Sequence, residues 1–459
     1  MLQVVLISTY ELGRQPFGLA SPAAWLRQAG VRVTCLDLSV ERLNEEAIAS
    51  ADLVAFYVPM HTATRIAARV VERVKILNPN AHLCFYGLYA SMNESFLRTL
   101  GADTILGGEY EAGLASLVQR LRARPVAGTR SPQPEPLISL AKQQFLVPDR
   151  EGLAPLSRYA RLNVGHGRSK TVGYTEASRG CKHLCRHCPV VPVYQGMFRI
   201  VQRDVVLEDI RRQVAAGAEH ITFGDPDFFN GIGHALALVQ SIHQEHPHLT
   251  YDVTIKVEHL LKHAEHLGTL QETGCLFVTS AVESIDDRVL AILDKGHTRD
   301  DFIQVVRLCR ETGLVLNPTF VAFTPWISVE DYQDLLSLVA ELDLVDQVAP
   351  IQLAIRLLIP AGSKLLELPE VRNMVGLFDE AGLAYPWRHK DPRVDQLQAH
   401  IQTLVQAATS RGEEDRREIF SQVWMLAERS PVGSPRPLAH AASLPHPASI
   451  PYLTEPWYC

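Results

Sequence analysis

The first 122 residues alternate between short apolar runs and longer amphipathic segments. Buried strands are expected at 3–8, 31–38, 52–59, 82–88 and 103–108, because each is a short, nearly continuous apolar run. Helices are expected at 20–29, 43–50, 61–77, 93–100 and 110–122, where apolar residues recur at helical spacing. This alternation predicts an α/β, doubly wound domain with a parallel sheet covered on both faces. Ligands of such folds bind beyond the carboxyl ends of the strands.

The pattern changes after residue 122. Residues 123–164 contain many prolines and little periodicity, which predicts an interdomain linker. A second strand–helix alternation covers 165–365 and predicts a partial (β/α)6 barrel of TIM type. Its strands are expected at 171–177, 220–224, 251–256, 275–281, 314–321 and 349–357. Residues 366–430 are amphipathic and 431–459 are rich in Pro, Ala and Ser, which predicts a small helical C-terminal region and a flexible tail.

Composition and charge narrow the possible functions. The chain has 459 residues, 47% of them hydrophobic and 21% charged, with a formal net charge of −7. This acidic balance argues against a general nucleic-acid binder. We expect no membrane span, because no run of about 18 apolar residues occurs. The first residues read as a strand rather than a signal peptide, so we expect a cytoplasmic protein.

Three of the eight cysteines are closely spaced. Cys181, Cys185 and Cys188 form a C-x3-C-x2-C sequence. Three thiolates at this spacing can bind three irons of a [4Fe-4S] cluster and leave the fourth iron open. The alternative is a zinc site completed by His183 or His187, but no second Cys/His pair is evident in the sequence.

The triplet resembles the signature of radical S-adenosylmethionine (radical SAM) enzymes, although His187 stands where that family usually has an aromatic residue. The resemblance continues in HITFGDPDFFN (220–230) and FVTSAVES (277–284). It implies that SAM binds the open iron and is cleaved reductively to a 5′-deoxyadenosyl radical. The residues that it assigns to SAM binding are Gly224, Asp225, Asp227, Glu283 and Ser284.

Residues 16–37 and 105–121 resemble the cobalamin-binding domain that precedes the barrel in one class of radical SAM enzymes. The resemblance implies a corrinoid cofactor, with Gly107 and Gly108 letting the backbone approach it closely. Many such domains have a cobalt-ligating histidine after the first strand. The corresponding loop here, STYELGRQPFG, contains none.

The last residues, IPYLTEPWYC, resemble the start of the terminal motif of the CUAEP/CCAEP-tail radical SAM (seleno)protein family. That resemblance implies a redox-active thiol, Cys459, in catalysis. The chain stops after this cysteine, and a UGA codon read as a stop instead of selenocysteine would produce that end. The alternative is a frayed terminus with a spare cysteine.

These features predict a radical SAM enzyme that C-methylates an unknown small-molecule or peptide substrate with cobalamin as methyl carrier. One alternative is another radical SAM reaction, such as sulfur or selenium insertion or rearrangement, with a vestigial cobalamin domain. A second is a zinc or electron-transfer Fe–S protein without enzymatic activity. The expected protein partner is an electron donor such as flavodoxin or ferredoxin, and no membrane or nucleic-acid partner is expected. Lys256, Glu258 and Arg356 are predicted at strand ends, as substrate contacts or as rim salt bridges.

Overall fold

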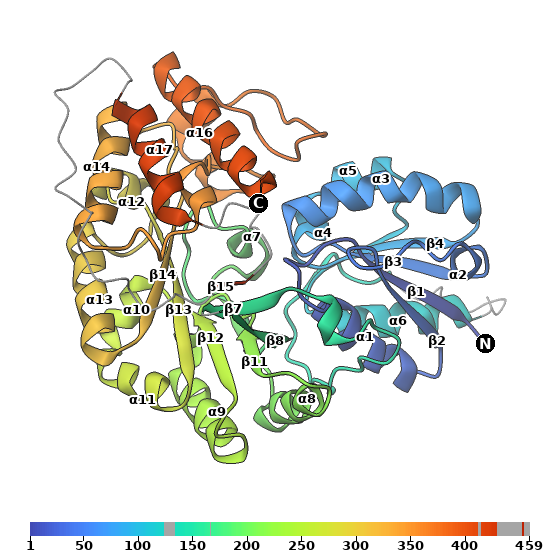
Figure 1. The fold of residues 1–459 in the computed structure, drawn as a ribbon. Helices are drawn as coiled ribbons and strands as arrows, with labels where there is room; N and C mark the ends of the chain where they lie inside the picture. The colour runs from blue at the N-terminus through green and yellow to red at the C-terminus, as the bar shows by residue number, and fades with distance from the viewer. Residues whose placement is uncertain (124–133, 166, 412–414, 429–451, 454–459) are drawn as a thin grey trace.

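The computed structural model describes residues 1–123, 134–165, 167–411, 415–428 and 452–453. Two α/β units lie beside one another (Figure 1), the N-terminal one in blue and the larger second one in green to orange. The predicted fold class, a doubly wound domain followed by a partial barrel and C-terminal helices, is confirmed. No helix in these described ranges is long and apolar enough to cross a membrane.

The N-terminal sheet has the order β2-β1-β3-β4-β5-β6, and all its strands are parallel. Its strands are β1 (Gln3–Ser8), β2 (Arg32–Asp37), β3 (Leu53–Tyr57), β4 (His82–Tyr86), β5 (Thr104–Gly108) and β6 (Ile138–Ser139). Its helices are α1 (Phe17–Gln28), α2 (Glu45–Ala49), α3 (His61–Leu77), α4 (Leu88–Met92), α5 (Glu94–Thr99) and α6 (Tyr110–Arg122). Two separate apolar cores, one under α1 and α6 and the other under α2, α3 and α5, explain why the strands read as continuous apolar runs.

The second sheet has the order β14-β13-β12-β11-β8-β7-β15. Five strands are parallel, while β7 runs antiparallel to β8 and β15 antiparallel to β7. The strands are β7 (Arg161–Gly165), β8 (Arg168–Thr175), β11 (His220–Phe223), β12 (Thr250–Thr254), β13 (Cys275–Glu283), β14 (Val315–Phe320) and β15 (Tyr452–Leu453). A separate antiparallel pair, β9 (Ser178–Gly180) and β10 (Phe198–Ile200), lies next to the cysteine triplet.

Helices cover the outer face of the curved second sheet, and the C-terminal helices close one end (Figure 1). The helices after β9 are α7 (Val190–Tyr194), α8 (Arg203–Ala215), α9 (Ile232–Glu245), α10 (Val257–Lys262), α11 (Leu267–Glu272), α12 (Asp287–Leu293), α13 (Arg299–Thr312) and α14 (Val329–Glu341). The C-terminal region contains α15 (Pro369–Met374), α16 (Pro392–Ser410) and α17 (Arg416–Glu428). One large core joins the barrel helices to α16 and α17.

The strand predicted at 349–357 is wrong. Residues Pro350–Leu353 form a 3-10 helix, and only Arg356 makes a single bridge, to Phe323. Pro350 has no N–H to donate to a sheet ladder and favours the first turn of a helix. The apolar run IQLA is buried in either conformation, so its hydrophobicity did not distinguish them.

The predicted linker at 123–164 differs from the structure in part, since it supplies β6 to the first sheet and β7 to the second. Between these strands the connector is bonded to both domains. Asp149 pairs with Arg27 of α1 at 2.7 Å. Arg150 bonds Gln15 of the first domain and Asp209 of the second at 2.8–2.9 Å. The connector is therefore a docked segment over this stretch rather than a free tether.

Candidate active site

The cysteine triplet lies at the carboxyl end of β8, where the short strand β9 leads directly into Cys181. Gly180 adopts φ +75°, and a Cβ there would lie 2.4 Å from the carbonyl oxygen of Met197. Only glycine permits this turn with β10 packed against it. Cys181 and Cys185 are buried and Cys188 is partly buried, and the described cysteines form no disulfide.

The three thiols form a donor set that suits a cationic centre. Burial, together with the nearby charges of Cys185 and Cys181, raises the pKa of Cys188 to about 12. Burial also raises the pKa of Cys181. Three thiolates gathered in this way are stable only when a metal centre neutralises them. The residues present therefore fit an iron–sulfur cluster held by Cys181, Cys185 and Cys188.

Polar side chains from neighbouring loops support the triplet. Lys256 is buried, with its Nζ 3.7 Å from Sγ of Cys185. Oδ1 of Asn230 lies 3.9 Å from Sγ of Cys181 and accepts a hydrogen bond from the backbone N–H of Lys182 at 3.2 Å. An ammonium group beside a thiolate offsets its charge, and Lys256 also makes the predicted salt bridge, with Glu258 at 3.4 Å.

The histidines of the zinc alternative are both paired with carboxylates. His187 Nε2 lies 3.1 Å from Glu283. His183 lies 3.5 Å from both Asp227 and Glu258. Ligand atoms of Cys181, His183 and Asp227 lie within 4.8 Å of one another, but that group uses only one thiol. An arrangement that uses all three thiols favours the cluster.

Gly224 and Asp225 follow β11, as the sequence pattern predicts. Both residues mainly contact other residues of the same chain. The backbone N–H of Gly224 donates to Thr175 O at 2.8 Å, and the Tyr174 ring fills the space of a Cβ. Asp225 accepts hydrogen bonds from the Ala177 N–H at 2.9 Å and from the Ser178 hydroxyl at 2.6 Å. Burial raises the pKa of Asp225 to about 7 despite these bonds. Asp225 therefore holds the segment that leads into the cysteines.

Asp227 is fully buried and lies against two imidazoles. Its Oδ2 is 2.7 Å from Nδ1 of His259, although the contact lacks the angles of a hydrogen bond. Burial alone would raise the pKa of Asp227, but His183 and His259 lower it to about 2. The Asp227 carboxylate is therefore negatively charged beside the cysteine loop.

Glu283 and Ser284 end β13 on the same side of the barrel. Glu283 has φ +68°, unusual for a residue with a Cβ, and its carboxylate contacts His187 at 3.1 Å and Lys295 at 3.4 Å. Burial favours protonation of Glu283, but Lys295 and His187 lower its pKa to about 2. Ser284 accepts a hydrogen bond from the Asp286 N–H at 3.1 Å. Backbone strain of this kind is concentrated at functional sites.

Side-chain atoms of three buried polar residues in the barrel meet no hydrogen-bond partner among the described residues, and the sequence pattern did not predict these residues. They are Ser280 of β13, His297, and Thr324 beyond β14. Burial, with Lys295 and Lys256 nearby, lowers the pKa of His297 to about 4, so its imidazole is neutral. Buried polar atoms without partners indicate a ligand or water in that space, which suits the polar groups of SAM or a substrate. Ser280 lies within FVTSAVES (277–284), which resembles the SAM-binding segment, but nothing in the sequence pattern singles out these three residues.

A cavity of about 240 Å³ lies between the two domains. Glu11 and Arg14, from the loop after β1, face it, and within the described part of the chain their Oε2 and Nε atoms have no hydrogen-bond partner. Burial raises the pKa of Glu11 well above its ordinary value. The amide-bearing rim of a corrinoid could satisfy both atoms, so these residues fit that cofactor. The volume is below the roughly 300–1,000 Å³ usual for small-ligand pockets, so side chains must move before so large a group can bind.

The predicted glycine pair lies at the end of β5. A Cβ on Gly107 would lie 2.4 Å from Ser91 Oγ, and one on Gly108 (φ +71°) would lie 2.3 Å from Ser139 O. Both glycines therefore permit close packing within the N-terminal domain, and Gly108 also lines the cavity. Cys459, the remaining predicted site residue, lies outside the described residues.

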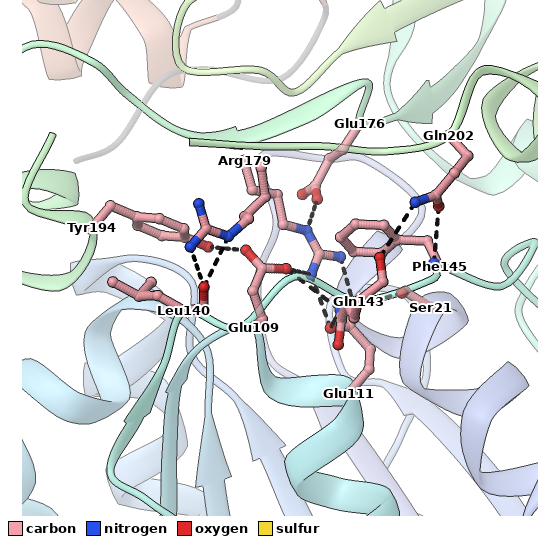
Figure 2. A network of polar contacts seen from close by, with 11 residues as sticks. Ser21, Glu109, Glu111, Leu140, Gln143, Phe145, Glu176, Arg179, Tyr194 and Gln202 are labelled. Carbon is pink, nitrogen blue, oxygen red and sulfur yellow. Dashed lines mark hydrogen bonds and ion pairs between the residues drawn. The ribbon is translucent and has the colours of Figure 1, made fainter. Parts of the chain in front are cut away.

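Arg179, two residues before Cys181, joins the domains (Figure 2). Its guanidinium contacts Glu111 at 2.7 and 2.9 Å, Glu109 at 3.4 Å and Glu176 at 2.6 Å. Tyr194 of α7 donates to Glu109 at 3.1 Å. Burial, offset in part by Arg179, raises the pKa of Glu109 to about 7. This network ties the loop before the cysteines to the first helix turn after β5.

Arg356 was predicted at a strand end, as a substrate contact or as a rim salt bridge. It bonds Asp395 at 2.6 Å and stacks on the Trp387 ring at 3.4 Å. Of the two predicted roles for Arg356, the structure therefore contains the salt bridge.

Comparisons with known proteins agree with this geometry. The B12 binding domain model matches residues 3–118, and the Radical SAM superfamily model matches 175–341. Hopanoid C-3 methylase of Methylococcus capsulatus is 24% identical over 326 residues, which are 68% of this chain and 62% of the methylase. An uncharacterised methyltransferase of Pyrococcus horikoshii is 23% identical over 298 residues, 62% of this chain and 61% of the relative. The chain thus spans less than two thirds of the length of these curated relatives.

Solved structures share the arrangement of both domains. The cobalamin-dependent radical SAM enzyme OxsB with aqua-cobalamin bound superposes with a TM-score of 0.67 at 14% identity, covering 94% of this chain and 72% of that one. The radical SAM methyltransferase TsrM of Kitasatospora setae gives a TM-score of 0.62 at 19% identity, covering 75% and 72%. At these identities the likeness establishes the fold. Together with the two family models, it shows that this chain joins a B12 binding domain to a domain of the radical SAM superfamily.

Proposed function

We propose that this chain is a cobalamin-dependent radical SAM enzyme that methylates a carbon atom of its substrate. One observation supports this assignment above the others. The interdomain cavity is lined by Glu11 and Arg14 on the B12 side, and by Gly180 and Gly224 on the barrel side. Gly180 directly precedes Cys181, and Gly224 belongs to the predicted SAM segment. The sites predicted for the two cofactors therefore border the same cavity.

When bound, the cluster and SAM would supply a hydrogen-abstracting adenosyl radical, and the corrinoid would supply a methyl group. The residues of the chain hold and orient these groups. Cys181, Cys185 and Cys188 would bind iron, and Lys256 offsets thiolate charge at 3.7 Å from Cys185. The buried hydroxyls of Ser280 and Thr324 would accept or donate hydrogen bonds to SAM or substrate.

The test is anaerobic purification with iron and corrinoid analysis, followed by SAM cleavage with dithionite. We expect about four irons per chain, release of 5′-deoxyadenosine, and loss of both in Cys188→Ala. Cys309→Ala is the matched control, because Cys309 is a buried thiol of α13 distant from the triplet in sequence. A fully loaded protein that does not cleave SAM would overturn the proposal.

A second candidate is a radical SAM reaction without a corrinoid. The interdomain cavity favours it, because its volume of about 240 Å³ is small and Tyr57 and Tyr110 line it. Corrinoid content separates the two candidates. SAM cleavage by protein that takes up no cobalamin during expression or reconstitution would support the second.

We further propose that the chain is a member of the CUAEP/CCAEP-tail family and that Cys459 is a redox-active thiol. The support is the sequence IPYLTEPWYC alone. Cys459→Ser should leave 5′-deoxyadenosine release intact and abolish substrate turnover. Unchanged turnover would refute this role. A reducing cytoplasmic location agrees with the seven described cysteines, which form no disulfide among themselves.

A further inference from the structure

A single buried arginine joins the N-terminal domain to the segment that leads into the cysteines (Figure 2). The side chain of Arg179 is 7% exposed and contacts three carboxylates. Glu111 accepts hydrogen bonds from two of its nitrogens at 2.7 and 2.9 Å, and Glu109 lies 3.4 Å away. Both acids lie at the start of α6, whereas Glu176, at 2.6 Å, directly follows β8. One guanidinium therefore holds acidic groups of both domains.

Aromatic rings surround the same guanidinium. Its Cζ lies 5.0 Å from the ring centroid of Tyr110, 5.1 Å from that of Phe145 and 5.7 Å from that of Phe17. Because the side chain of Arg179 is almost fully buried, solvent screens its ion pairs little. A planar guanidinium can pair with several carboxylates and stack on rings at once, which a lysine ammonium group cannot do. The contacts therefore depend on arginine in particular and not on positive charge alone.

On the barrel side, Arg179 is closely connected to the first predicted cluster ligand. It is the middle residue of β9, whose backbone is paired with β10. Only Gly180 separates it from Cys181, and the φ of +75° at Gly180 forms the tight turn between them. Because the pairing fixes β9 and a single residue intervenes, the position of Arg179 constrains where Cys181 can lie.

On the other side, the start of α6 forms part of the interdomain cavity. Gly108, Tyr110 and Arg179 all line this cavity. Glu109 and Glu111 flank Tyr110 in the sequence, so the carboxylates that hold Arg179 lie on the same turn as the cavity wall. A group that fills the cavity therefore contacts the turn to which Arg179 is bound.

A second arginine joins the two domains at a different place. Arg150 of the connector bonds Gln15 at 2.8 Å and Asp209 of α8 at 2.9 Å. Gln15 and Arg150 line a separate cavity of about 370 Å³ beside α8. Among the described residues, Arg150 contacts neither the start of α6 nor the cysteine loop. It is therefore a matched comparison for an interdomain contact that does not lead to Cys181.

We propose that Arg179 is a positioning residue that couples corrinoid binding in the interdomain cavity to SAM binding at the cysteine loop. This proposal rests on the proposed function, which assigns these ligands to the two sites. When the cavity is occupied, the turn that carries Glu109 and Glu111 is fixed, and through Arg179 so is the segment that leads into Cys181. SAM then binds to a site that is already ordered, so its affinity rises. By linkage, SAM raises the affinity for the corrinoid by the same factor.

The test measures binding without turnover, on the full chain loaded anaerobically with its iron–sulfur centre but expressed without cobalamin. Equilibrium dialysis without reductant gives the dissociation constant of SAM in the absence and presence of saturating hydroxocobalamin. The dissociation constant of hydroxocobalamin is then measured with and without SAM. The variants are Arg179→Lys on the barrel side and Glu111→Gln on the other side, and Arg150→Lys is the control. Iron content is measured in every preparation.

In the wild type we expect each ligand to lower the dissociation constant of the other about tenfold. In Arg179→Lys and in Glu111→Gln this factor should fall to about one, because lysine lacks the planar fork and glutamine lacks the charge. The double variant should lose no more than either single variant, since both changes break the same connection. Arg150→Lys should keep the wild-type factor even where its thermal unfolding midpoint falls as far as that of Arg179→Lys.

Wild-type protein that binds both ligands with unchanged dissociation constants would overturn the coupling. So would a factor that survives in both network variants, since direct contact between the two ligands would then explain it. A factor lost equally in Arg150→Lys would also overturn it, because any loosening of the domains would then suffice. If Arg179→Lys incorporates less iron than the wild type, Glu111→Gln decides the question from the other domain. Wild-type protein that binds no SAM or no hydroxocobalamin would instead refute the proposed function.

Discussion

Replacing Arg179 with methionine tests the ion network between the domains. The guanidinium is 7% exposed and contacts Glu109, Glu111 and Glu176 within 3.4 Å. Methionine keeps much of the side-chain length but leaves three carboxylates without their cation. Removing one partner of a buried pair costs about 3–5 kcal/mol, because the remaining charge stays desolvated. We expect a loss of that size in the free energy of unfolding at pH 8.

The pH dependence of this loss is a second readout. Without Arg179 the pKa values of the carboxyls rise further, since burial already raises that of Glu109 to about 7. The folded variant then binds protons that the unfolded chain does not, so its deficit shrinks as the pH falls from 8 to 6. Equilibrium urea unfolding, followed by both circular dichroism and tryptophan fluorescence, measures the change and checks two-state behaviour.

Arg211→Met is the matched control, because Arg211 makes a comparable double contact with Glu245 on the surface. We expect no measurable change there, since solvent screens exposed pairs. The double variant Arg179→Met/Glu111→Gln should be less destabilised than the sum of the single variants. A loss below about 1 kcal/mol in Arg179→Met, or a deficit that does not change with pH, would refute the reasoning.

Three further predictions follow from buried groups elsewhere. Asp225→Asn should remove one pH-dependent contribution to stability: because the pKa of Asp225 is raised to about 7, its contribution is most favourable below pH 4 and declines by roughly 4 kcal/mol as the pH rises to 7. Chemical denaturation of the apoprotein across this range measures it, and parallel curves for the two proteins would contradict it. Gly108→Ala should destabilise the protein by about 1–3 kcal/mol through contact with Ser139 O. Gly152→Ala is the control for backbone strain alone, because Gly152 has φ +84° and nothing lies within 4 Å of its Cβ position. Equal shifts of the thermal unfolding midpoint in the two glycine variants would argue against a role of the contact with Ser139. Glu11→Gln should raise the thermal unfolding midpoint, because it removes an acid whose ionised form is desolvated, and should lower corrinoid retention measured by visible absorbance. Unchanged retention would exclude Glu11 from the cofactor site.

The strands could be predicted where burial on both faces of the sheet makes a continuous run of residues apolar. The central residues of runs such as QVVLIS and DLVAFYVP are all apolar because helices cover both faces of their sheet. The strand expected at 349–357 failed because burial there comes from irregular backbone packed under α16 and α17. β6, two residues long, has no periodicity that could reveal it.

The candidate site was predictable only where its chemistry is local in sequence. The spacing of Cys181, Cys185 and Cys188 is contained within eight residues. Arg179, by contrast, meets Glu111 across 68 positions, and Lys256 meets Cys185 across 71. Such pairs depend on how elements far apart in the sequence are packed together in space. A single sequence contains no signal that connects them.

The docked connector between β6 and β7 has a consequence for assembly. Because Asp149 and Arg150 bond both domains, the domains cannot separate on a free hinge while these contacts hold. A cofactor larger than the interdomain cavity requires the side chains that line it to move, and such movement is easier before the connector docks or after it melts locally. The amount of cofactor bound then depends on whether the cofactor is supplied before or after the chain has folded. Cobalamin supplied while the chain is being synthesised should be retained far better than cobalamin added to the finished protein.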